Sequence, residues 1–125
     1  MLNRPQRFGL AGEALAADIL RRSGYRILAR NYRTKVGEID IVARDGETLV
    51  FVEVKSRRDG GLYGHPKYAV NRAKQRKLSK AALWYLKETG QLGRRARFDV
   101  VAIIYRGVGD IQWEIVRNAF ELAYG

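Results

Sequence analysis

Three charged side chains stand where the surrounding residues predict buried β-structure. Asp40 lies in the alternating segment at residues 38–43, and the pair Glu53-x-Lys55 ends an apolar run that starts at residue 49. Charged groups are costly to bury unless they are paired or bind a metal ion. Carboxylates that hold Mg²⁺ beside a lysine are the groups that phosphodiester cleavage requires, because the metal activates water and the lysine stabilises developing charge.

A predicted β-hairpin would position these groups. Asp45-Gly46 between two β-branched runs is a strong hairpin signal. A two-residue loop would set Asp40 opposite Phe51 and diagonal to Glu53, whereas a four-residue loop would set Asp40 directly opposite Glu53. Both registers keep the carboxylates and Lys55 on one face, roughly 5 to 8 Å apart at Cβ. A three-residue loop or a bulge would break this geometry. A shared divalent cation would relieve the carboxylate repulsion, and a carbonyl such as that of Val54 would complete its ligand shell.

The rest of the chain predicts one domain, 1–125, of the α/β class, with a small mixed sheet flanked by helices. Residues 1–7 are expected to form a flexible basic tail. The expected elements are a helix from residue 8 to Gly24, strands at 25–32, 38–43 and 48–54, a helix at 70–89, strands at 97–105 and 111–116, and a short helix at 118–123. Trp84 and Tyr85 are expected in the core.

Charge predicts the partner. The net charge of +11 on 125 residues favours a polyanion. The start of the second helix, the loop at 61–66 and the segment 94–97 would follow a nucleic-acid backbone without reading bases. His65 in that loop is expected to be an exposed polar residue. The residues predicted to contact nucleic acid are Arg57, Arg58, Arg72, Lys74, Lys77, Arg94 and Arg95.

Composition also argues against other classes of protein. The chain has no cysteine, which excludes disulfides and thiolate zinc sites. No apolar run is long enough to span a bilayer, no signal peptide is expected, and a cytoplasmic location fits. A membrane-surface role is disfavoured because neither helix is expected to combine a basic face with the exposed face of Trp, Phe and Leu that such a role needs.

Two further acids have alternative interpretations. Glu13, in the first helix, is by itself a first-turn acid favoured by the helix dipole. Asp99, in the strand at 97–105, is either a core acid paired with an arginine or a further site residue, and we favour the structural interpretation.

The segments GEIDIVARDG and LVFVEVKSR, preceded by GLAGEALAADIL, resemble the YraN family of small bacterial proteins. That family is similar to archaeal Holliday-junction resolvases and belongs to the PD-(D/E)XK nuclease superfamily. The resemblance extends to Lys74 and the helix after it, to RFDVV at 97–101 and to NAF at 118–120. The proline of the nominal PD motif is replaced by Ile39.

The resemblance implies a restriction-endonuclease-like fold with an αβββαβ core, and a homodimer. It also implies site roles: Glu13 would be the helical acid, Asp40 the motif aspartate, Glu53 the second metal ligand and Lys55 the catalytic lysine.

Three hypotheses follow. The first is a Mg²⁺-dependent endodeoxyribonuclease, with Mn²⁺ as an alternative metal, acting on DNA that includes branched forms. The second is a catalytically inactive nucleic-acid-binding module on the same fold. The third is a buried Asp40–Lys55 ion pair that only fixes the hairpin register, and we rank it last because it leaves Glu53 unpaired.

Overall fold

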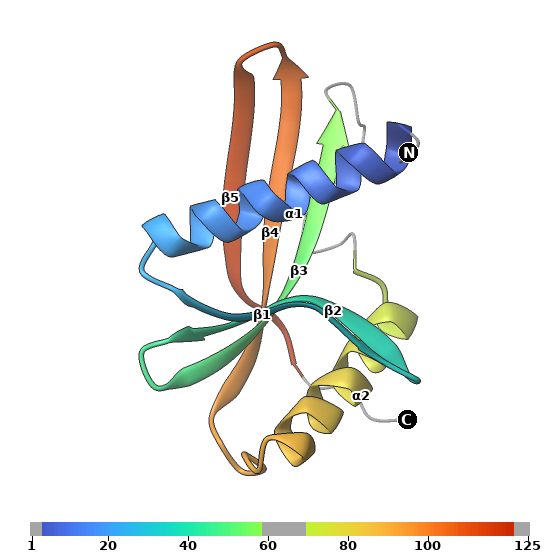
Figure 1. Ribbon diagram of the computed structural model, residues 1–125, viewed down its shortest axis with the longest axis vertical. Coiled ribbons are helices and arrows are strands. Elements are labelled where there is room, and N and C mark those ends of the chain that lie inside the picture. The colour runs from blue at the N-terminus through green and yellow to red at the C-terminus, as the bar shows by residue number, and fades with distance from the viewer. Residues whose placement is uncertain (1–3, 59–69, 122–125) are drawn as a thin grey trace.

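The computed structural model describes residues 4–58 and 70–121, with side chains from residue 12 onward. The loop at 61–66 and His65 therefore lie outside the described residues. The elements are α1 (Arg4–Arg22), β1 (Arg26–Thr34), β2 (Gly37–Asp45), β3 (Thr48–Arg58), α2 (Arg72–Glu88), β4 (Ala96–Gly107) and β5 (Asp110–Phe120), as labelled in Figure 1.

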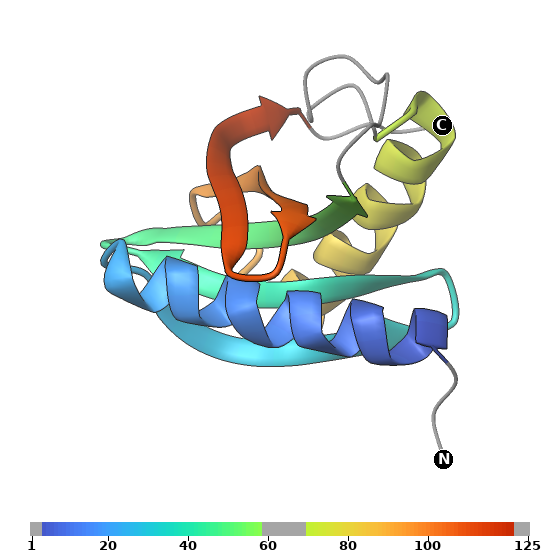
Figure 2. The same cartoon turned by 90° about the horizontal axis from the view of Figure 1, so that it is seen from above.

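The described strands form one mixed sheet in the order β1-β2-β3-β4-β5. β3 and β4 are parallel, with α2 between them in the chain, and the other neighbours are antiparallel. The two helices lie on opposite faces of the sheet (Figure 2). The α/β class, the mixed sheet flanked by helices and the αβββαβ order are confirmed.

Each helix packs on its own apolar layer. Small residues of α1 such as Ala16 pack against β-branched residues of the strands, including Ile41 and Val52. On the other face, Leu78 and neighbouring residues of α2 cover Phe51 and its surroundings. β3 is thus buried on both faces, as expected for a central strand.

The hairpin takes one of the two predicted registers. Arg44 pairs with Leu49, which is the alternative that aligns Asp40 with Glu53. The pairing extends to Asp45–Thr48, so that only Gly46 and Glu47 lie outside the strands. Gly46 has φ +59°, and a positive φ at the first loop residue alone is the pattern of a type II′ turn.

Three local predictions were wrong. Residues 118–120, expected in a helix, belong to β5, where Asn118 has φ 52° and its N–H donates to the buried Asp99 carboxylate at 2.9 Å. Residues 4–7, expected in a tail, begin α1. Trp84 is 51% exposed rather than in the core, whereas Tyr85 is buried as predicted.

Candidate metal and phosphate site

Asp40 stands where β2 and β3 separate. Their backbone pairing runs from Asp45–Thr48 to Ile41–Val52. The next β3 amide that points toward β2 is that of Val54, and it donates to the Asp40 Oδ2 atom at 2.8 Å instead of to a β2 carbonyl. Because N–H and C=O of one strand residue point to the same edge, the Val54 carbonyl lies on the Asp40 side of β3. The structure therefore brings together the Asp40 carboxylate and the Val54 backbone.

Glu53 lies on the same face, one residue beyond the last β2–β3 pair. It is 5% exposed, and its Oε1 atom lies 3.7 Å from Lys55 Nζ and 3.4 Å from Lys74 Nζ. Lys55 therefore pairs with Glu53. The alternative in which Lys55 pairs with Asp40 and leaves Glu53 unpaired is wrong.

Lys74 is the site residue whose position the sequence did not reveal. It was predicted only as a nucleic-acid contact. Asn71 caps α2 by accepting the Lys74 N–H at 2.9 Å, which places Lys74 in the first helical turn. The Asn71 cap marks where the helix starts, but it does not show that this turn faces β3.

The two central carboxyl groups resist ionisation. Burial, followed by the nearby Asp40 charge, raises the pKa of Glu53 to about 7. Burial also raises the pKa of Asp40, opposed by the hydrogen bond from Val54. Glu53 is buried and Asp40 half-buried, and two such acids whose charges oppose each other form a place where a cation is favoured.

Glu13 joins this group from α1. Burial and the Asp40 charge raise the pKa of its carboxyl group. Its Oε2 atom is buried and, within the described part of the chain, has no hydrogen-bond partner. The preceding residue is Gly12, where a Cβ would collide with Ser56 Oγ, so this glycine allows α1 to approach β3 closely.

The candidate ligand atoms at this site are of the type that Mg²⁺ prefers. Glu13, Asp40, Glu53 and the Val54 carbonyl all offer oxygen, which Mg²⁺ prefers, and one Glu13 oxygen is buried with no hydrogen-bond partner among the residues that the structure describes. Among residues 4–58 and 70–121, however, no three acidic or histidine side chains are already grouped closely enough to hold an ion. The Glu53 charge is balanced by two ammonium groups instead. Metal loading would therefore require Glu53 to exchange lysine contacts for a cation.

Asp99 belongs to a separate structural network. It is fully buried, and it accepts hydrogen bonds from Tyr25 Oη at 2.7 Å and from Arg97 Nε at 3.0 Å. Arg97 also pairs with Asp45 at 2.7 Å, tying β4 to the end of β2. The geometry supports the core-acid interpretation.

The predicted nucleic-acid contacts fall into separate regions. Arg72, Lys74 and Lys77 lie on α2, and of these Lys74 pairs with Glu53. Arg57 and Arg58 end β3. Arg94 instead donates to the Glu47 carbonyl at 3.3 Å, at the hairpin loop. Since Glu53 lies several residues further along β3, at ~3.3 Å per residue, the structure does not bring Arg94 and its neighbour Arg95 to the carboxylates.

The fold and site define a small α/β domain with a carboxylate–lysine cluster at the point of a mixed sheet where β2 separates from β3. The chain belongs to the family described as Uncharacterised protein family UPF0102, the YraN family, whose model matches residues 12–103. No helix in the described ranges is long and apolar enough to cross a membrane.

Relatives match over nearly the whole chain. A UPF0102 protein of Desulfosudis oleivorans is 54% identical over 97% of this chain and 95% of its own. One of Geobacter sulfurreducens is 56% identical over 93% and 90%. One of Symbiobacterium thermophilum is 50% identical over 92% and 97%. The family predicted from the GEID and EVK segments is confirmed.

Proposed function

We propose that this protein is a Mg²⁺-dependent endonuclease that acts on DNA. The observation that carries the proposal is the convergence of Asp40, Glu53 and Lys55 on one sheet face, where β2 separates from β3. Such a set is what phosphodiester cleavage needs, and the raised carboxyl pKa values are typical of functional clusters.

Each residue has a role in the proposal. Glu13, Asp40, Glu53 and the Val54 carbonyl would hold the cation, which would supply Lewis-acid activation of the phosphodiester. Asp40 is oriented by the Val54 amide, which restrains one oxygen and leaves the other for a ligand. Lys55 would orient water or stabilise charge on the phosphate once Glu53 binds the cation instead of the Lys55 ammonium group.

The charge distribution supports a DNA substrate. α2 contains Arg72, Lys74, Arg76, Lys77, Lys80 and Lys87 against one acid, Glu88. Lysine and arginine contacts to phosphates supply sequence-independent affinity. Branched DNA and a homodimer are proposed from the resemblance to resolvases, and light scattering of the free and DNA-bound protein would test the dimer.

A second candidate is a nucleic-acid-binding module without turnover. The observation that favours it is the double lysine pairing of Glu53, which already balances the charge that a metal would balance. In this reading α2 binds the backbone and the carboxylates only hold the lysines in place.

The deciding experiment combines metal titration with cleavage. Wild type, Glu53→Ala and Lys55→Ala would be titrated with Mg²⁺ and Mn²⁺ by calorimetry and incubated with labelled linear, flapped and four-way DNA. Glu47→Ala, an exposed loop acid, is the matched control. Metal binding lost in Glu53→Ala, with cleavage lost in both site variants, supports the enzyme. DNA binding without metal uptake or cleavage supports the module.

A further inference from the structure

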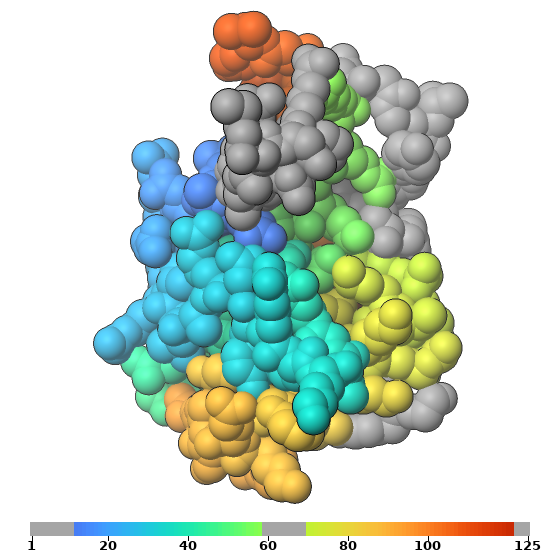
Figure 3. All heavy atoms as spheres, turned by 45° about the vertical axis from the view of Figure 1, so that its right-hand side comes forward, coloured from blue at the N-terminus to red at the C-terminus, as the bar shows by residue number. Residues whose placement is uncertain are grey.

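The β1–β2 hairpin forms a second basic feature next to the site. Its tip packs against α2, with a cavity of about 420 Å³ between them lined by residues 33–38 and Lys77. Figure 3 shows the hairpin and α2 side by side on one face of the molecule. A Cβ on Gly37 would lie 2.8 Å from the Lys77 carbonyl oxygen, so the glycine permits this close contact.

The hairpin tip is held in shape by its own hydrogen bonds. Thr34 Oγ1 accepts the N–H groups of Val36 and Gly37, each at 3.1 Å, and lies 2.9 Å from the Gly37 carbonyl, to which it donates. These amides are thereby used within the turn. An anion at the tip would have to be bound by side chains.

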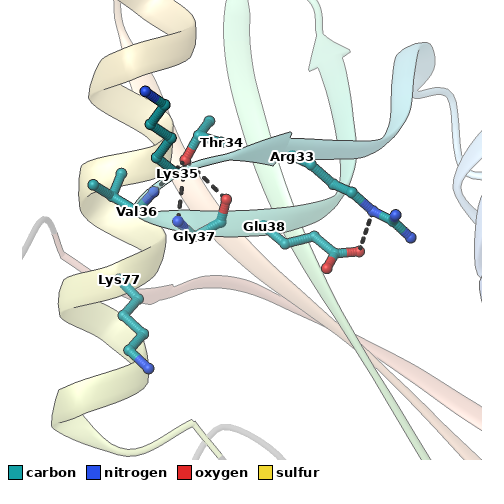
Figure 4. A pocket seen from close by; sticks show the side chains of 7 residues that line it. All are labelled: Arg33, Thr34, Lys35, Val36, Gly37, Glu38 and Lys77. Carbon is teal, nitrogen blue, oxygen red and sulfur yellow. Dashed lines mark hydrogen bonds and ion pairs between the residues drawn. The ribbon is translucent and has the colours of Figure 1, made fainter.

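The lining side chains carry excess positive charge. Arg33 pairs with Glu38 at 3.6 Å, which offsets one charge. Lys35 and Lys77 are both exposed, and neither pairs with a carboxylate within the described ranges. Figure 4 shows the two lysines on opposite sides of the tip, and the Arg33–Glu38 pair further along the strands. The lysines therefore suit two neighbouring phosphates better than one shared phosphate.

The tip also has a defined position relative to the carboxylates. Gly37 precedes Asp40 by three residues on β2, a span of about 10 Å, or about three base-pair steps of DNA. Lys74 and Lys77 are one helical turn apart and so face the same side of α2. Positive side chains thus extend along α2 from Lys74, which contacts Glu53, to Lys77 at the tip.

We infer that Lys35 and Lys77 form a phosphate-binding subsite at the hairpin tip, which holds the DNA backbone about three base-pair steps from the bond at the carboxylates. The inference deepens the proposed function and rests on it for the identity of the polyanion. The ligand is a phosphodiester backbone, and binding of the two phosphates positions the substrate.

The test measures binding apart from cleavage. Wild type, Lys35→Gln, Lys77→Gln and the double variant would be titrated with fluorescent DNA duplexes in chelator at several salt concentrations. Arg106→Gln, an exposed cation on β4, is the matched control. Thermal unfolding checks each variant, and the exposed side chains make misfolding unexpected.

Each single variant should bind roughly three- to tenfold more weakly, and each should reduce the salt slope by about 0.9. The double variant should show both effects additively, while Arg106→Gln binds as wild type. Inorganic phosphate at matched ionic strength should compete weakly, because one free anion cannot bridge both lysines.

The outcomes separate this inference from the proposed function. Wild-type binding by the double variant overturns the subsite, and cleavage with metal then still stands as its own result. A subsite that is required for binding, in a protein that cleaves nothing with Mg²⁺ or Mn²⁺, supports the inference and overturns the nuclease. Absence of DNA binding by wild type overturns the subsite and removes the substrate of the proposed enzyme.

Discussion

Lys74 of α2 places its ammonium group 3.4 Å from the Glu53 carboxylate of β3. This ion pair joins the basic helix to the acidic end of the sheet. The lysine that would attract a phosphate backbone is therefore in contact with a carboxylate that would bind a cation. A change in the charge around one of these groups changes the electrostatic energy of the other. Loading of a cation on Glu53 would free Lys74, so metal and DNA binding are expected to be coupled.

Stability should depend on pH through Glu53. Its folded pKa is about 7 against an ordinary value of 4.5. Between these values the folded state holds more protons than the unfolded state, so the free energy of unfolding falls as pH rises, by at most ~1.4 kcal/mol per pH unit. This contribution is fully present below pH 4.5 and is lost as pH rises through about 7. Glu53→Gln should flatten the slope in urea unfolding performed in chelator, and an unchanged slope would count against the raised pKa.

Divalent cations should restore the folding stability that is lost as pH rises. At a pH above 7, where the Glu53 carboxylate is ionised, Mg²⁺ or Mn²⁺ should raise the Tm of wild type. A ligand at a hundred times its Kd stabilises by ~2.7 kcal/mol. The shift should be smaller at acidic pH and absent in Glu53→Gln and Asp40→Asn, as followed by differential scanning fluorimetry. An equal shift in all three proteins would place the ion elsewhere.

Lys74→Ala should separate metal binding from DNA binding. Removal of the ammonium group weakens DNA binding and lowers the salt slope by about one unit. The change also removes an ammonium group that competes with the metal ion for the Glu53 carboxylate. The affinity for Mn²⁺ at alkaline pH should therefore increase or stay the same. Calorimetry with Mn²⁺ and anisotropy with DNA would measure both, with Arg106→Ala on β4 as the control. A parallel loss of both affinities would contradict the competition.

Asp99→Asn should destabilise the fold. The change leaves Arg97 paired with Asp45 alone and puts an amide among the donors of a buried network, and an unsatisfied buried polar group costs about 1–3 kcal/mol. Tyr25→Phe removes one hydrogen bond to the carboxylate and should cost about 1–3 kcal/mol. Chemical unfolding would measure both. Metal affinity per folded molecule should not change, and a specific loss of it would make Asp99 a site residue.

Gly37→Ala should separate the hairpin tip from α2. The new Cβ would lie 2.8 Å from the Lys77 carbonyl oxygen, a backbone atom that cannot rotate away, and such overpacking costs about 1–3 kcal/mol. Gly107→Ala is the matched control, because a Cβ there meets nothing within 4 Å. Equal stability of the two variants would show that the close contact is not required.

The sequence by itself determined the parts of the fold that depend on short-range patterns. Apolar periodicity defined the helices and strands, Asp45-Gly46 defined the hairpin, and charges on an apolar strand marked Asp40 and Glu53. Alternation put these side chains on one face in either predicted register. All of these signals lie within a few residues of each other, where local geometry is restricted.

Only the tertiary structure decided which distant groups meet. It selected the register that aligns Asp40 with Glu53, brought Lys74 to Glu53 and moved Arg94 to the hairpin loop. It also drew Asn118 into β5, where its amide satisfies Asp99. The physical reason is that these contacts depend on how the crossover helix and the last strand pack on the finished sheet. Burial of a charge then selects its partner by proximity in space, which no local spacing encodes.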